Sequence, residues 1–179
     1  MKTARSVARK NSMMRGIVMV ILRVWKMPQV RLKKRFLMQC YQSLGMTGLK
    51  EPVLRAMYLI ITLQQGAPYA GWSDQYFVDN LKPAHGRSYE PRSVSTATTN
   101  RIIRLLMQYY RLTGDTRFLA GIPNAIDFLE SVKIPAEEAK KWRRQPRTPE
   151  EILVPRFIHP ETGEPQYVHR KGSNVKNGK

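Results

Sequence analysis

The sequence predicts an all-α protein of repeated helical hairpins joined by long loops. Apolar residues recur at three-to-four spacing in several segments, the period of a helix with one buried face. A nine-residue pattern occurs twice, and no region rich in strand-forming residues stands out. With 179 residues, 42% of them apolar, the chain fits one domain with a sizeable core. Helical hairpins bury their apolar faces by stacking on one another, so two copies are typical of part of a solenoid or an α/α toroid.

The repeated pattern is L-M-Q-x-Y-x-x-x-G, at Leu37–Gly45 and again, 69 residues later, at Leu106–Gly114. Each copy is predicted to form a helix, a turn at the glycine and a second helix. A chance likeness between two amphipathic hairpins is the alternative, and the shared letters favour a true repeat. In the first copy, Glu51 and Pro52 suit a helix start, and the apolar run Val53–Leu63 suits the body of that helix.

In the second copy, single residues mark the turn. Gly114 suits the left-handed residue that closes a helix, and Asp115 suits the cap of the next one. Pro123 fits the first turn of a further helix. The apolar stripes predicted to face the core are Ile102, Leu105, Leu106, Tyr109, Tyr110 and Leu112 before the turn, and Phe118, Leu119, Ile122, Ala125, Ile126, Leu129 and Val132 after it.

After Pro135 the chain changes character. Residues 137–144 are predicted to form a short charged helix around Trp142, which the following prolines end. Three further prolines predict irregular structure beyond it, with Tyr167–His169 as a short extended piece. Residues 171–179 contain little to bury.

The net charge of +18 normally suggests an anionic partner. Twelve of the 31 Lys and Arg residues lie in residues 1–50, which contain no Asp or Glu. Three interpretations of residues 1–34 stay open: a targeting leader, a basic arm for nucleic acid or a membrane surface, and a segment foreign to the domain. The apolar run there is too short to span a bilayer. Cys40, the single cysteine, allows no intrachain disulfide and fits a core position.

Familiar catalytic motifs are absent from the sequence. It has no Gly-rich phosphate loop, no Cys/His spacing typical of a metal site, and no serine in a triad-like pattern. The three histidines, His85, His159 and His169, lie in predicted loops. The acidic residues Asp74, Asp79 and Glu90 are explained as well by hydrogen bonding as by calcium binding.

The segments Gly71–Tyr76 and Leu81–Pro91 are rich in rings, glycine and proline, and have the period of neither helix nor strand. Loops of this kind often present ligand sites. A guanidinium binds carboxylates through a planar fork, and flat aromatics suit sugar rings, so Arg87 with Trp72 and Tyr89 fits an acidic sugar polymer. In the alternative, the two aromatics pack the loop on the helices and Arg87 pairs with Glu90.

Residues 35–175 resemble the pectate lyases of polysaccharide lyase family 10, which adopt an α/α toroid. Gly71-Trp72-Ser73-Asp74-Gln75 resembles the family's G-W-x-Q region, and Leu81–Pro91 resembles its L-x-P-A-x-A-R-x-Y-E-P segment. The third likeness is to the family's R-F…T-x-x-P…R-x-G segment, carried by Arg156, Phe157, Thr162, Pro165, Arg170 and Gly172. The central motif is the most specific of the three, because its order and its spacing both hold.

The resemblance implies calcium-assisted β-elimination on polygalacturonate. A base removes the C5 proton of a galacturonate, calcium neutralises the carboxylate, and the glycosidic bond breaks. Arg87 inherits the role of the base; because a free arginine keeps its proton at ordinary pH, that role requires surroundings that favour the neutral form, as other cations do and Glu90 does not. No metal ligand is assigned in this chain. The substrate-binding residues implied are Trp72, Gln75, His85, Tyr89, Glu90, Arg156 and Arg170.

The chain departs from the family pattern in several places. His85 stands where the family has lysine, Gly86 where alanine is common, and Glu164 where the family has arginine. Family members also have N-terminal helices with acidic residues used for calcium and for a second catalytic role, and residues 1–34 contain none. The resemblance therefore implies the C-terminal part of a catalytic module, for which an inactive fragment is one expected outcome.

These expectations divide the chain into a basic segment of uncertain structure or disorder (1–34), a partial α/α-toroid pectate lyase module (35–175) and a tail (176–179). The expected partner is an acidic polysaccharide, and nucleic acid is not favoured. The protein is expected to be a monomer without a membrane span, and to be secreted or periplasmic. The alternative is a basic helical-repeat binding protein for nucleic acid or another polyanion. Its binding then depends on residues 1–34 and falls steeply with salt.

Overall fold

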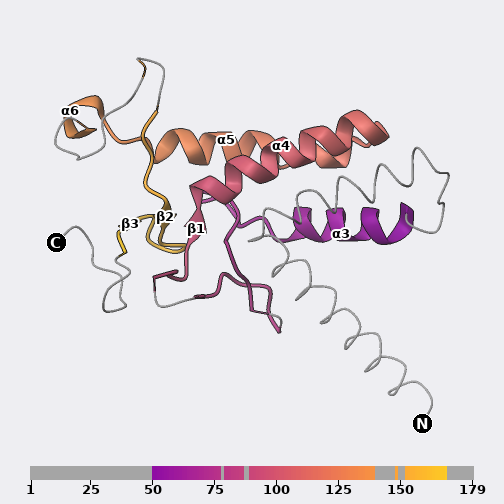
Figure 1. The fold of residues 1–179 in the computed structure, drawn as a ribbon, viewed down its shortest axis with the longest axis horizontal. Helices are drawn as coiled ribbons and strands as arrows, with labels where there is room; N and C mark the ends of the chain where they lie inside the picture. Colours follow the sequence, from indigo (N-terminus) through magenta and orange to yellow (C-terminus); the bar gives the residue numbers. More distant parts are fainter. Residues whose placement is uncertain (1–49, 78, 87–88, 140–147, 149–151, 169–179) are drawn as a thin grey trace, which may run out of the picture. The chain divides into compact units, whose positions relative to one another are not determined.

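The computed structural model describes residues 50–77, 79–86, 89–139, 148 and 152–168. This part is mostly helical (Figure 1), with α3 (Lys50–Thr62), α4 (Thr96–Thr113), the 3-10 helix η2 (Thr116–Phe118), α5 (Ile122–Ser131) and α6 (Ala136–Ala139). Three short strands accompany the helices: β1 (Val94–Ser95), β2 (Phe157–Ile158) and β3 (Pro165–Gln166). The prediction of a helical protein is confirmed at that level, and the all-α class is corrected by the small sheet. The toroid stays a prediction.

The chain divides into two compact units, residues 1–62 with 76–82, and residues 63–75 with 83–179. In the first, α3 covers most of the predicted apolar run, with Met57 and Ile60 buried. A tight turn closes residues 77–82, because the N–H of Phe77 donates to the carbonyl of Lys82 and the N–H of Leu81 donates to that of Phe77. Leu81 adopts a left-handed φ of 56° in this turn.

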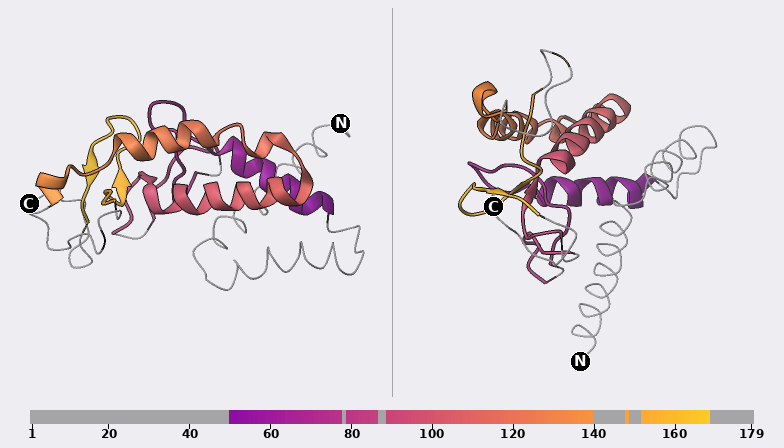
Figure 2. Two further views of the ribbon diagram at one scale, coloured as in Figure 1. Left: turned by 90° about the horizontal axis from the view of Figure 1, so that it is seen from above. Right: turned by 60° about the vertical axis from the view of Figure 1, so that its left-hand side comes forward.

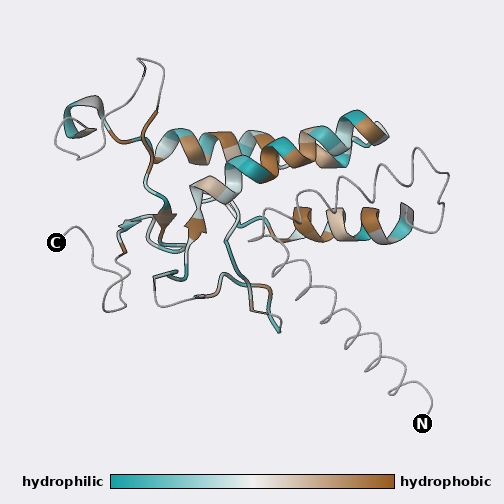
Figure 3. Ribbon diagram, viewed as in Figure 1, coloured by the Kyte–Doolittle hydropathy of each residue, from teal (hydrophilic) through white to brown (hydrophobic). Residues whose placement is uncertain are grey.

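In the second unit, α4 and α5 lie side by side (Figures 1 and 2) and are joined through η2. Apolar and polar segments alternate along both helices (Figure 3), as expected for helices with one buried face. The side chains that face the core are Ile102, Ile103, Leu106 and Tyr109 on α4, and Ile122, Ala125 and Phe128 on α5.

Two members of the predicted stripes were wrong. Leu112 is 38% exposed and Ile126 is 46% exposed. Leu112 lies in the last turn of α4, where the helix runs out to its capped end. Ile126 follows the fully buried Ala125, so it lies about 100° further around α5. Phe128, which the predicted stripe left out, occupies the buried face instead.

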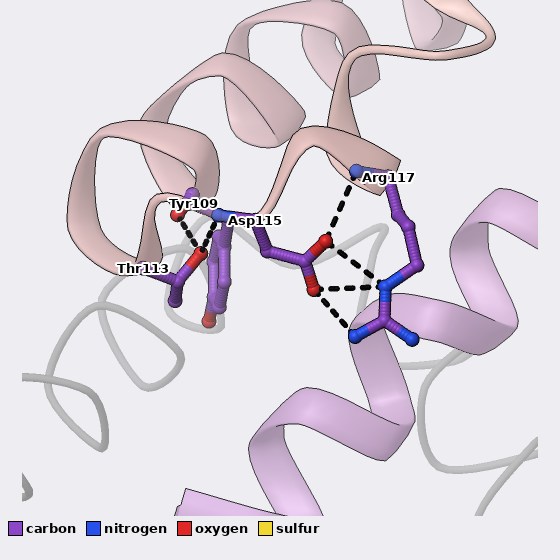
Figure 4. Close-up of polar contacts among 4 residues, drawn as sticks. All are labelled: Tyr109, Thr113, Asp115 and Arg117. Atoms are coloured by element: carbon purple, nitrogen blue, oxygen red, sulfur yellow. Dashed lines mark hydrogen bonds and ion pairs between the residues drawn. The ribbon is translucent and has the colours of Figure 1, made fainter.

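The turn between α4 and α5 follows the chemistry of its residues (Figure 4). Gly114 closes α4 with a left-handed φ of 71°, and its N–H donates to the carbonyl of Tyr110 at 2.8 Å. The hydroxyl of Thr113 donates to the carbonyl of Tyr109 at 2.7 Å and accepts from the N–H of Asp115 at 3.2 Å. The Asp115 carboxylate then caps η2 by accepting from the N–H of Arg117 at 3.0 Å. The predicted roles of Gly114 and Asp115 are confirmed, and so is Pro123 in the first turn of α5.

The strands form one antiparallel sheet in the order β1-β2-β3, with Val94 opposite Ile158 and Phe157 opposite Gln166. Val94 and Ile158 form a core cluster with Phe128 of α5. The sheet therefore fixes the segment around residues 156–158 beside the start of α4. The strand β3 covers Pro165–Gln166, directly before the extended piece predicted at Tyr167–His169, the last residue of which lies outside the described part of the chain.

Several predictions lie outside the described residues. They concern residues 1–34, the first copy of the repeat with Cys40, the charged helix beyond Ala139 and the tail 176–179. Within the described part of the chain, no helix combines the length and the apolar character needed to cross a membrane.

Candidate active site

The first turn of α4 is an anchoring point for two other segments. Ser95 caps the helix, its side chain accepting from the N–H of Thr98 at 3.3 Å. Thr96, Thr98 and Thr99 follow, and all three are buried. Buried hydroxyls need hydrogen-bond partners, and these threonines find theirs in residues 72–74 and 155–156, far away in the sequence.

Residues 71–75 are attached to this turn through the backbone of Trp72. Its N–H donates to Oγ1 of Thr99 at 3.0 Å, and its carbonyl accepts from the N–H of Ser95 at 2.8 Å. The backbone of Gly71 lies close to three core side chains. A Cβ added at Gly71 would stand 2.5 Å from Thr99, 2.6 Å from Val94 and 2.7 Å from Phe128. The side chain of the next residue, Trp72, is completely buried.

The burial of Trp72 bears on its predicted part in substrate binding. A fully enclosed indole has no free face to stack on a sugar ring. This burial favours the alternative in which Trp72 packs the loop on the helices, and its role in substrate binding stays a prediction.

Arg156 is attached to the same turn from the other side. Its carbonyl accepts from the N–H of Thr96 at 3.1 Å, and the Thr96 hydroxyl donates to the carbonyl of Pro155 at 2.8 Å. The side chain of Arg156 is 63% exposed, and its guanidinium carbon lies 4.8 Å from the centre of the Phe157 ring. The backbone is therefore fixed while a cation faces solvent above an aromatic ring.

Asp74 joins these two segments. Its carboxylate accepts a hydrogen bond from the Thr98 hydroxyl through Oδ1. Its other oxygen, Oδ2, lies 3.9 Å from Nη2 of Arg156. The Asp74 side chain is only 16% exposed, so a largely enclosed carboxylate stands next to the exposed guanidinium.

A second polar pair lies one residue further along. Nε2 of Gln75 donates to Oε2 of the buried Glu90 at 3.0 Å. The carbonyl of Gln75 accepts from the N–H of Ala84, and that of Glu90 accepts from the N–H of Gly86, both at 2.9 Å. A Cβ on Gly86 would overlap Nε2 of Gln75 and Oε2 of Glu90. Residues 84–86 and Glu90 are therefore held by hydrogen bonds, whereas Arg87 and Arg170 lie outside the described residues.

His85 and Tyr89 complete the predicted set. The side chain of His85 is exposed and that of Tyr89 is half-buried. The fold thus brings Gln75 together with Glu90, and places both in the compact unit that contains Arg156.

The comparison with known families fits these segments. The family model described as Pectic acid lyase matches residues 53–175. The chain belongs to the pectic acid lyase family. The predicted resemblance is confirmed, and the matched range includes the loop at residues 71–91, the start of α4 and Arg156. No match was found among curated protein sequences.

Sequence reasoning missed the threonines of this pectic acid lyase family member. Thr96, Thr98 and Thr99 supply the hydroxyls that hold residues 72–74 and 155. The run Ser-Thr-Ala-Thr-Thr at residues 95–99 was the available signal, because so many hydroxyls at a helix start exceed what capping alone requires.

The described residues can be compared with the ligand sets that a metal ion needs. No group of three or more His, Cys, Asp and Glu side chains among them is arranged to hold a metal ion. The two enclosed carboxylates near the loop have other partners, since Asp74 is bonded to Thr98 and Glu90 to Gln75.

Proposed function

We propose that the protein cleaves pectate, the polymer of galacturonate, by β-elimination. The observation that carries the proposal is the family match over residues 53–175, which includes every described segment gathered at the start of α4. The exposed guanidinium of Arg156 supports it, because a planar guanidinium is suited to the carboxylates that the polymer repeats along its length.

The reaction needs a base and a means of stabilising negative charge. The base takes the proton from C5 of one galacturonate, the electron pair forms a C4–C5 double bond, and the bond from C4 to the glycosidic oxygen breaks. That oxygen takes up a proton, so the polymer is cut without adding water. We assign the base to Arg87, which stands between Gly86 and Glu90, residues held together by the hydrogen bond between the Gly86 N–H and the Glu90 carbonyl.

We assign roles to the other predicted residues from the family resemblance and, for the described residues, from their contacts. Arg156 and Arg170 bind substrate carboxylates, and the exposed His85 and half-buried Tyr89 contact the sugars. Gln75 and Glu90 bond to each other, and we assign them to hold the loop that carries Arg87. We assign the buried Trp72 to pack the loop against the rest of the fold.

The expectations of calcium use and of a location outside the cytoplasm both depend on the family match. Calcium that neutralises the galacturonate carboxylate is the expectation from the family, while the described residues contain no cluster of three or more His, Cys, Asp and Glu side chains arranged to hold a metal ion. The two arginines, Arg156 and Arg170, are assigned to bind the same substrate carboxylates. We propose that the protein acts outside the cytoplasm, where polymeric pectate is available.

The direct test follows the ultraviolet absorbance of polygalacturonate incubated with the purified full-length chain. Absorbance of the unsaturated product is expected to grow, and Arg87→Ala is expected to abolish the growth while the circular dichroism of the protein stays unchanged. Parallel reactions with calcium and with a chelator measure the dependence on the ion. No growth under either condition, from a protein with an intact helical spectrum, would contradict the proposal.

The concentration of positive charge in residues 1–50 favours one second candidate, a polyanion-binding protein. In that case binding of polygalacturonate and of DNA should be alike, fall steeply with salt, and disappear when residues 1–34 are deleted. Lyase-type binding should survive the deletion and prefer polygalacturonate.

A further inference from the structure

We propose that Asp74 is a positioning residue for substrate binding, which holds the guanidinium of Arg156 in the direction of a substrate carboxylate. The inference rests on the proposed function, since it takes pectate as the ligand of Arg156. It concerns a residue that the sequence left as a general hydrogen-bonding group, and it follows from contacts made across more than eighty positions of the chain.

The carboxylate of Asp74 is itself fixed. Its side chain is 16% exposed, and an enclosed carboxylate requires partners for its charge. Oδ1 takes the hydroxyl proton of Thr98, which lies in the first turn of α4. The neighbouring Trp72 backbone is bonded to Ser95 and Thr99 in that turn. Oδ2 therefore has a defined place at the edge of the enclosed region.

The guanidinium of Arg156 is held by that fixed oxygen and by Phe157. Nη2 lies 3.9 Å from Oδ2 of Asp74, and the guanidinium carbon lies 4.8 Å from the centre of the Phe157 ring. A long exposed side chain loses conformational freedom when it binds a ligand. Contacts with a fixed charge and a ring restrict Arg156 before the ligand arrives, which reduces that loss.

The looseness of the ion pair matters for the role. A guanidinium has five N–H donors, and a two-pronged pair with Asp74 would occupy the fork that a substrate carboxylate needs. At 3.9 Å the contact is longer than a hydrogen bond, so it orients the cation and leaves its donors available. A pair of this kind adds little to folding stability, so its expected effect is on binding.

The central variant is Asp74→Asn in the full-length chain. Asparagine keeps the size and an oxygen acceptor for the Thr98 hydroxyl, and removes the charge that faces Arg156. We expect KM for polygalacturonate and the calorimetric Kd for the polymer to rise about 3- to 5-fold, the upper part of the range for an exposed ion pair, with kcat nearly unchanged. In the Arg156→Ala background the same substitution is expected to add nothing.

Two further sets of variants sharpen the test. Glu161→Gln changes the net charge by the same amount and breaks another exposed pair, with Arg92, and is expected to leave KM unchanged. Thr98→Val removes the hydroxyl that fixes Asp74 without altering the carboxylate, so it should raise KM in the same direction, and Thr98→Ser should restore it. This second pair carries the test should Asp74→Asn fail to fold.

The outcomes separate the inference from the function on which it rests. Wild-type protein that neither binds nor cleaves polygalacturonate overturns the proposed function and the inference together. Wild-type protein that binds, with Asp74→Asn equal to it or binding more tightly, overturns the inference alone. A loss that persists undiminished in the Arg156→Ala background also overturns it, because Asp74 would then act through another group.

Discussion

The backbone N–H of Trp72 donates a 3.0 Å hydrogen bond to Oγ1 of Thr99, and the same hydroxyl donates to the carbonyl of Ser95 at 2.9 Å. One buried hydroxyl thus joins the start of α4 to residues 71–75, which carry Asp74 and Gln75. Because a donor left without a partner in the interior carries the full penalty of losing water, this contact should matter for stability.

Thr99→Val tests that contact. Valine keeps the shape but removes the acceptor of the Trp72 N–H, so the free energy of unfolding is expected to fall by about 1–3 kcal/mol, measured by urea denaturation. Thr62→Val is the control, because the exposed Thr62 hydroxyl also donates to the carbonyl four residues earlier, that of Tyr58. It should alter stability much less. An equal loss in the two variants would show that valine in a helix, not the missing acceptor, is responsible.

Gly71→Ala tests the close approach behind Trp72. The new Cβ would stand 2.5–2.7 Å from Thr99, Val94 and Phe128, and overpacking of this kind destabilises a core by about 1–3 kcal/mol. Gly66 is the matched control, since a Cβ there meets nothing within 4 Å. Gly66→Ala should be neutral or slightly stabilising. Unfolding midpoints that are the same for the two variants would contradict the packing described for residues 71–72.

Gly86→Ala tests the hydrogen bond between Gln75 and Glu90, which lies next to Gly86. The family commonly has alanine here, yet in this chain a Cβ would overlap the ends of Gln75 and Glu90. The substitution is expected to break their hydrogen bond, with a loss of about 1 kcal/mol in stability and a lower kcat on polygalacturonate. In the Gln75→Ala background, where the bond is already absent, Gly86→Ala should add little. A full additional loss there would mean that the two residues act separately.

Tyr109 should give the protein a distinct alkaline pH dependence. Burial raises the pKa of its phenol from 10.0 to about 12, so the folded state holds this proton where the unfolded state has lost it. The contribution of Tyr109 to the free energy of unfolding should be constant below about pH 10 and fall by roughly 1.4 kcal/mol per pH unit between pH 10 and about 12. Denaturation of Tyr109→Phe over the same range should show a shallower slope. Identical slopes for wild type and variant would contradict the burial of this phenol.

Features that depend on single residues and their immediate neighbours were predicted correctly from the sequence. Gly114 and Asp115 form the predicted caps because each acts on its immediate neighbours. The strands escaped prediction because segments of two residues have no period to detect. Ile126 was placed wrongly because an apolar residue at the edge of a helix face fits the spacing as well as one inside it.

In the candidate site too, local motifs could be predicted from the sequence, whereas contacts between distant residues could not. The resemblance pointed to the loop at residues 71–91 and to Arg156, and the family match over residues 53–175 confirms the kinship while the roles of these residues stay predictions. Pairings between distant residues were not readable, since nothing in the sequence links Asp74 to Thr98 or to Arg156 before the chain is folded. The burial of Trp72 was likewise open, because an aromatic residue in a loop serves packing and sugar binding equally well.

Elimination and hydrolysis of polygalacturonate can be distinguished by the mass of the products formed in water enriched in oxygen-18. Elimination cuts the polymer without adding water, so we expect fragments that carry an unsaturated end and no heavy oxygen from the cleavage, once exchange at the reducing end has been subtracted with a saturated standard. Fragments that gain one molecule of water at every cut would show hydrolysis instead and would contradict the assignment of a pectate lyase.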